Sequence, residues 1–197
     1  MAESPRRPGE SQASVARRGI RWDALAAIIA SLVGLLALIV AGYTAYIQRQ
    51  QVRAQVWPYI ALGTSNAGGQ YEIYALNNGV GPAIVKSVQV LVAGKPVKDW
   101  NSLYKAVGFA STGKQVTSTL NRIVVPAGGH VHWIRFTDAA RIDAFTDDLV
   151  RSGAVFRVCY ASTLGEAWMT VYTLKTMPRR RPVAACPKVP WALQFHG

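Results

Sequence analysis

The sequence predicts a mainly β protein, in which an N-terminal transmembrane helix is followed by a β-sandwich with two short helical insertions. Residues 24–48 carry no formal charge and are largely aliphatic. Beyond Pro58, short runs alternate apolar and polar residues with the period of a β-strand. Turns rich in Gly, Asn and Pro separate these runs. Hydrophobic residues make up 50% of the chain, enough for both a membrane helix and a domain core.

The apolar stretch sets the boundaries of the N-terminal part. We expect residues 1–22 to be a disordered, basic cytoplasmic tail, because they contain few large apolar residues. Residues 23–47 should form the transmembrane helix, since about 20 apolar residues cross a bilayer core. Residues 48–56 contain good helix formers and should continue the helix as a stalk, which Pro58 ends at the latest.

Arginines flank the apolar stretch unevenly. Five precede it and two follow it closely, which favours a cytoplasmic N-terminus and an exported C-terminal domain. They are Arg6, Arg7, Arg17, Arg18 and Arg21 on one side, and Arg49 and Arg53 on the other. A cleaved signal peptide is the alternative, but its apolar region is usually about 7–15 residues long. We therefore expect an uncleaved anchor.

A β-sandwich is expected over residues 57–176, because several short strands with regular turns are typical of this architecture. The strands are expected at about residues 56–63, 70–77, 83–93, 116–125, 130–137, 154–162 and 167–175. Residues 177–197 are interpreted as a Pro-rich C-terminal tail packed on the domain.

Two helical insertions interrupt the strands. Asp99 can cap a first helix that Gly108 ends, and Asp138 can cap a second helix that ends at Ser152 and Gly153. Spacings of three and four place the apolar residues of each helix on one stripe, which suits packing on a sheet. The stripes are Trp100, Leu103 and Val107 on the first helix, and Ile142, Phe145 and Leu149 on the second.

Cys159 and Cys186 are the only cysteines of the chain. Strand alternation puts Cys159 on the outer face of its strand, opposite Phe156, Val158 and Tyr160, where the tail could cross it. In an oxidising compartment this pair predicts a disulfide, with two unpaired thiols as the alternative.

The tail carries two candidate binding features. Arg179, Arg180 and Arg181 form the densest basic cluster, which could contact phosphate groups of lipid or another polyanion. A solvated tail is the alternative. Trp191, Leu193 and Phe195 fall on one face of an extended chain. They either pack on the domain, which we favour, or form a patch that binds a partner.

His130 and His132 lie two residues apart and therefore share a strand face. Two imidazoles could bind a metal, but Ile134 and Phe136 continue that face, which indicates the rim of the core. A third ligand would have to come from Asp138, His196 or elsewhere. Nucleophile, phosphate-loop and dinucleotide motifs are missing from the sequence. We therefore expect no metal, no cofactor and no enzymatic activity.

The net charge is +12, from 22 Lys and Arg against 10 Asp and Glu. Such a basic chain favours anionic surroundings, such as phospholipid head groups, acidic glycans, nucleic acid or an acidic protein. For an exported domain we expect an anionic lipid, a glycan or an envelope protein as partner, and no nucleic acid. A merely solvated surface is the alternative.

The turn sequences carry a resemblance to a known kind of domain. Residues 77–83 read NNGVGPA before an alternating strand, and residues 123–129 read IVVPAGG before another. These turns resemble bacterial immunoglobulin-like envelope domains of the adhesion-related type. From about residue 20 to 175 the chain is also similar to a group of uncharacterised bacterial single-pass membrane proteins, which share a Trp-Pro after the helix and a late Cys-Tyr hairpin. The resemblance implies an immunoglobulin-like fold and an envelope location, and no catalytic residues.

These observations predict a non-enzymatic protein of the bacterial inner membrane, whose periplasmic domain binds a partner protein or an envelope component. An accessory subunit of a larger membrane complex is one alternative, in which Ala30 and Gly34 would form a small-xxx-small helix face. A metal-dependent enzyme domain using His130 and His132 is another.

Overall fold

The computed structural model describes residues 22–110, 114–136 and 142–197. The chain divides into two compact units, Met1–Ile47 and Gln48–Gly197. Apart from Trp22, the tail expected over residues 1–22 lies outside the described residues.

Helix α1 runs without a break from Trp22 to Gln55, through both the expected membrane segment and the expected stalk. None of its side chains is buried. Within the described residues it is the one helix long and apolar enough to cross a membrane. Its composition and place in the chain suggest a membrane anchor or a signal sequence. Pro58 follows soon after and disfavours the helical conformation at Trp57.

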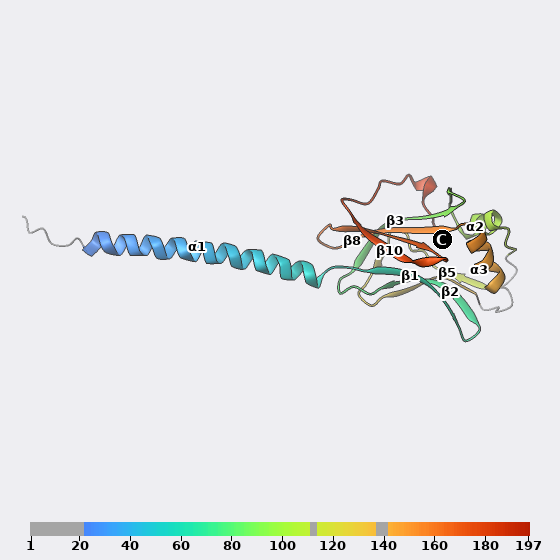
Figure 1. Cartoon of the computed structure of the whole chain (residues 1–197), viewed down its shortest axis with the longest axis horizontal. Helices are drawn as coiled ribbons and strands as arrows, with labels where there is room; N and C mark the ends of the chain where they lie inside the picture. The colour runs from blue at the N-terminus through green and yellow to red at the C-terminus, as the bar shows by residue number, and fades with distance from the viewer. Residues whose placement is uncertain (1–21, 111–113, 137–141) are drawn as a thin grey trace, which may run out of the picture. The chain divides into compact units, whose positions relative to one another are not determined.

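The rest of the chain is mainly β and forms two antiparallel sheets (Figure 1). Sheet A has the order β1-β2-β7-β5, and sheet B has the order β10-β9-β8-β3-β4 with β6 also paired to β3. Sheet A consists of β1 (Ile60–Ala67), β2 (Gln70–Asn77), β5 (Gln115–Thr117) and β7 (His130–Phe136). Sheet B consists of β3 (Ala83–Val92), β4 (Lys95–Val97), β6 (Val124–Val125), β8 (Val155–Ala161), β9 (Ala167–Thr173) and β10 (Thr176–Val183).

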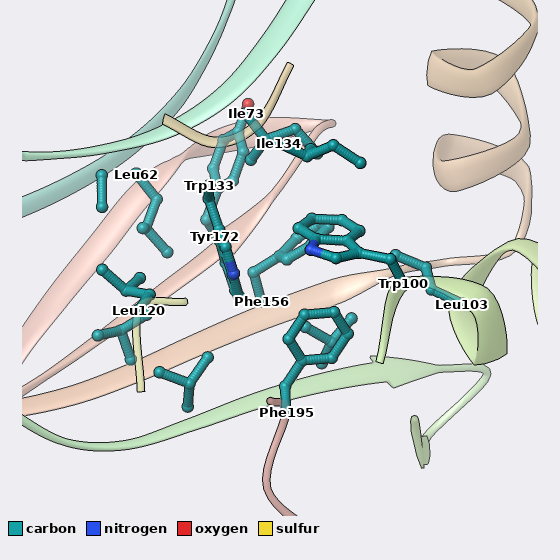
Figure 2. Close-up of a cluster of buried hydrophobic side chains, with 14 of the residues drawn as sticks. Leu62, Ile73, Trp100, Leu103, Leu120, Trp133, Ile134, Phe156, Tyr172 and Phe195 are labelled. Carbon is teal, nitrogen blue, oxygen red and sulfur yellow. The ribbon is translucent and has the colours of Figure 1, made fainter. Parts of the chain in front are cut away.

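The inner faces of the two sheets share one hydrophobic core. Trp133 of β7 meets Phe156 of β8, with ring centroids 5.6 Å apart. Figure 2 shows both rings close to Trp100, which comes from a helix, and to Phe195. Phe195 belongs to residues 184–197, which follow the last strand and are called the C-terminal segment. Phe195 lies 5.0 Å from Trp100 and 5.5 Å from Trp133. Near the end of this segment, Phe195 therefore inserts into the core.

Two short helices lie at one end of the sheets (Figure 1). Helix α2 (Trp100–Val107) matches the prediction closely: Asp99 accepts from the Ser102 amide at 2.7 Å, and Gly108 ends the helix with φ of 78°. Helix α3 (Ile142–Arg151) buries Phe145 and Leu149 as expected, but its expected cap, Asp138, lies outside the described residues. A further helical turn, η2 (Trp191–Leu193), was not expected.

Four stretches of the chain differ from the strand prediction. The strand expected at residues 116–125 is divided between β5 and β6, in different sheets, because Leu120 is buried and Arg122 has φ of 60°. Strand β4 was not among the expected strands: it follows a turn at Ala93-Gly94, where both φ values are positive. The first strand begins at Ile60 instead of residue 56. Finally, β10 occupies the start of the expected tail, where Pro178 and Pro182 are compatible with an edge strand.

Candidate functional site

The C-terminal segment crosses the outer face of sheet B. Cys159 of β8 forms a disulfide with Cys186, and the two Cα atoms are 5.7 Å apart. Cys159 pairs in register with Ser87 and Met169, and it alternates with the inward-facing Val158. It lies on the outer face as predicted, yet it is fully buried. The predicted disulfide is present and ties the C-terminal segment to the middle of the sheet.

A cleft of about 620 Å³ is lined jointly by this segment and the sheet. Three cationic residues line it, and they come from distant parts of the sequence: Lys86 in β3, Arg122 before β6, and Lys188 after the disulfide. All three are exposed. Ser87, Ser162, Thr163 and Gln194 add hydroxyl and amide groups, small or apolar residues line the rest, and none of the described lining residues is acidic. Such a lining favours a phosphate or carboxylate ligand.

The turn that carries Arg122 is fixed to the C-terminal segment. Asn121 donates to Gln194 Oε1 at 2.9 Å, and Gln194 donates to the Val189 carbonyl at 2.7 Å. The Arg122 guanidinium carbon lies 4.7 Å from the centroid of the Trp191 ring, a cation–π distance. The cation is therefore held by packing at the cleft, which lowers the entropy lost when a ligand binds.

The basic cluster at residues 179–181 lies in strand β10, and the strand divides it. Arg180 stacks over Trp57 and Tyr59, with its guanidinium carbon 4.8 and 4.5 Å from their ring centroids. Arg179 and Arg181 pair with Val171 and Met169 of β9, which themselves pair with Arg157 and Cys159 of β8. Because residues paired across a sheet share a face, Arg179 and Arg181 lie on the outer face. The expectation of one three-arginine cluster in the tail is therefore wrong: the arginines belong to a strand, and Arg180 is separated from the other two.

The outer face of sheet B thus combines the cations of the cleft with those of the strands. We call this surface the basic face. It consists of six exposed side chains: Lys86, Arg122, Arg157, Arg179, Arg181 and Lys188.

The expectation that Trp191, Leu193 and Phe195 share a face is wrong. The helical turn η2 rotates the chain between them. Phe195 is 1% exposed and packs in the core, whereas Trp191 and Leu193 are 57% and 44% exposed. Trp191 contacts His196, with ring centroids 3.9 Å apart, and Arg122. One residue packs as favoured, and the other two lie at the surface.

A second group of polar side chains lies on the outer face of sheet A. The pairing of β2 with β7 shifts register between Ile73 and Tyr74, so that Trp133 and Ile134 are both buried. This bulge moves His130 and His132 to the face opposite Ile134 and Phe136. The expectation that the two histidines share a face with Ile134 and Phe136 is therefore wrong, and the histidines do not line the rim of the core.

Glu72 joins the two histidines and was not identified from the sequence. Its Oε2 atom lies 2.5 Å from His132 Nδ1 and 3.2 Å from an Arg135 nitrogen, and Oε1 lies 3.6 Å from His130 Nε2. Burial raises the pKa of Glu72, but hydrogen bonds from His132 and Arg135 outweigh it, and the net shift is downward. Glu72 occupies a polar position in the alternating pattern of β2. Its neighbours on β7 become apparent only from the pairing of the two strands.

Comparisons of the chain with protein-family models, with curated proteins and with solved structures gave no match. The basic face combines the cleft with six exposed cations. The group of Glu72, His130 and His132 on sheet A is compact and carries potential metal ligands.

Proposed function

We propose that this chain is a non-enzymatic, membrane-anchored envelope protein whose exported domain binds an anionic envelope component through the basic face. The observation that carries the proposal is the cleft, which Lys86, Arg122 and Lys188 line without an acidic residue among its described lining. Helix α1 supports an anchor, and the disulfide supports an oxidising compartment. Two antiparallel sheets around one core support an immunoglobulin-like sandwich as the fold.

The spacing of the cations favours an extended ligand. Arg157 and Arg179 both pair with Val171, from opposite sides, and therefore stand two strands apart, about 10 Å. A single phosphate cannot reach both of these arginines and the cleft. A polymer or surface with repeated phosphate or carboxylate groups can, and its charges would be met by several exposed cations at once. We therefore propose an acidic glycan or an array of lipid head groups as the ligand.

The direction of export rests on the flanking charges. Five arginines precede the apolar stretch and two follow it, which supports a cytoplasmic N-terminus and a domain exposed on the far side of a bacterial inner membrane. There the basic face would meet the anionic polymers and lipids of the envelope.

Binding of a polyanion by the full chain in detergent micelles tests this proposal. We expect the chain to bind polyphosphate or polygalacturonate and not neutral dextran, and the two polyanions separate phosphate from carboxylate recognition. Lys86→Glu with Lys188→Glu should weaken binding at least tenfold, because two cleft cations become anions. Raising the salt concentration should weaken it too, since exposed charges are screened within about 10 Å at 0.1 M.

The matched control is Lys95→Glu with Lys98→Glu, an equal change of net charge at two exposed lysines away from the cleft. This pair should change affinity less than about twofold. An equal loss in both double variants would show that total charge, and not the basic face, determines binding, and it would contradict the proposal.

A further inference from the structure

The group of Glu72, His130 and His132 has the composition and spacing of a metal site. One ligand atom from each side chain lies within 4.8 Å of the other two. Zinc bound tetrahedrally at 2.0–2.1 Å separates its ligand atoms by about 3.3 Å. The distances of 2.5 Å between Glu72 Oε2 and His132 Nδ1, and 3.6 Å between Oε1 and His130 Nε2, lie on either side of that value. Small side-chain rotations would suffice to bring the three groups around one ion.

The hydrogen bonds of His132 conflict when no metal is present. Its Nδ1 atom lies 2.5 Å from Glu72 Oε2, an acceptor, and 2.5 Å from an Arg135 nitrogen, a donor. A protonated Nδ1 can donate to the carboxylate, but its hydrogen then faces the guanidinium N–H, which is also a donor. An unprotonated Nδ1 can accept from the guanidinium, but its lone pair then faces the carboxylate oxygen, which is also an acceptor. One nitrogen cannot satisfy both neighbours. A divalent cation would accept the lone pairs of Nδ1 and Oε2 together and would remove the conflict.

The surrounding strands hold the ligands in place. Tyr74 lies between β1 and the histidines, with its ring 5.0 Å from that of His130. A side chain at position 63 would collide with this ring, because a Cβ atom there would lie 2.7 Å from the Tyr74 hydroxyl. Gly63 therefore leaves room for Tyr74 to support His130. The bulge in β7 places His132 beside Glu72 on the outer face.

From these observations we propose that Glu72, His130 and His132 bind a zinc ion on the outer face of sheet A. Two imidazoles and one carboxylate suit zinc better than calcium or magnesium, which prefer oxygen ligands. The histidine side chains are 38% and 41% exposed, so the fourth ligand position is open to water or to a group of a partner. Arg135, whose side chain is 32% exposed, must rotate away from Glu72 when zinc enters.

Zinc binding by the full chain, purified in detergent micelles with a histidine-free affinity tag, tests this proposal. After removal of metals with a chelator, we expect calorimetric titration to show one zinc ion per chain. His130→Ala, His132→Ala and Glu72→Gln should each weaken binding at least tenfold, because each removes one of three ligands. Arg135→Gln should strengthen it severalfold, because a competing cation is lost. Cobalt should give the visible absorption bands of a tetrahedral site.

His196→Ala is the matched control, because His196 is the third and last histidine of the chain and belongs to the C-terminal segment. Its affinity should equal that of the wild type. Melting curves without metal identify variants that fail to fold, and His130→Asn or His132→Asn then replaces the alanine variant. Absence of zinc binding by the wild-type chain, or equal loss in His196→Ala and His132→Ala, would overturn the proposal. Neither result bears on polyanion binding by the basic face.

Discussion

Asn77 makes more hydrogen bonds with its side chain than other buried residues described for this protein. Its Oδ1 accepts from the amides of Tyr59 and Gly79, each at 3.0 Å. Its Nδ2 donates to the carbonyls of Gly81, Val125 and Pro126 at 2.8–3.1 Å. The side chain thereby joins the start of β1 to two turns. Glycine is required at position 79, where a Cβ atom would lie 2.5 Å from the Trp57 carbonyl oxygen.

Asn77→Ala should therefore lower the free energy of unfolding by about 3–5 kcal/mol, because several buried backbone groups lose their partner. Asn78→Ala is the control, since Asn78 is adjacent but exposed, and it should change the free energy by less than about 0.5 kcal/mol. Urea titration of tryptophan fluorescence measures both. Similar values for the two variants would show that the Asn77 network does not stabilise the fold.

At the scale of elements, local signals predicted some of the fold and long-range pairing determined the rest. Helix α2 was fully predictable, because its cap, apolar stripe and glycine stop are all local. Strand β10 was not, because its prolines are typical of loops and only the pairing with β9 makes it a strand. The bulge in β7 likewise depends on β2, so the face of the histidines and the partnership with Glu72 could not be read from alternation. The cleft brings together cations that are distant in sequence, and it forms only where the disulfide-bound C-terminal segment lies against sheet B. It could therefore not be predicted from the sequence.

The C-terminal segment is expected to stabilise the domain through a single side chain. Phe195→Ala should lower the free energy of unfolding by about 3–5 kcal/mol, because the ring is 1% exposed between Trp100 and Trp133. Leu193→Ala, two residues earlier and 44% exposed, should cost less than about 0.5 kcal/mol. The same urea titration compares them. A larger effect at Leu193 would contradict the packing described here.

The disulfide is expected to be complete in the mature protein. Intact-mass measurement after alkylation without a reductant should show no label on Cys159 or Cys186, because both sulfurs are bonded. Replacing both cysteines with alanine should cost about 3.5 kcal/mol, the stabilisation that the chain-entropy model gives for a sequence separation of 27. Two labels on folded protein taken from cells would remove the disulfide from the account.

At the scale of the whole molecule, we propose that helix α1 anchors an exported, basic domain. A reporter fused after Gly197 should be active only if it functions outside the cytoplasm. The reason is that the positive charges before α1 favour retention of the N-terminus in the cytoplasm. A second reporter that functions only in the cytoplasm is the control and should be inactive at the same position. Activity of that cytoplasmic reporter would contradict the proposed orientation.

Photocrosslinking in native membranes tests the central claim most directly. A photoreactive amino acid in place of Thr163, which is exposed and lines the cleft, should capture an anionic glycan or lipid. The same group in place of Asn66, which is exposed in sheet A, should not capture it. The product from position 163 should disappear when Lys86→Glu and Lys188→Glu are added. An identical product from both positions, or an uncharged product that survives charge reversal, would contradict binding by the basic face.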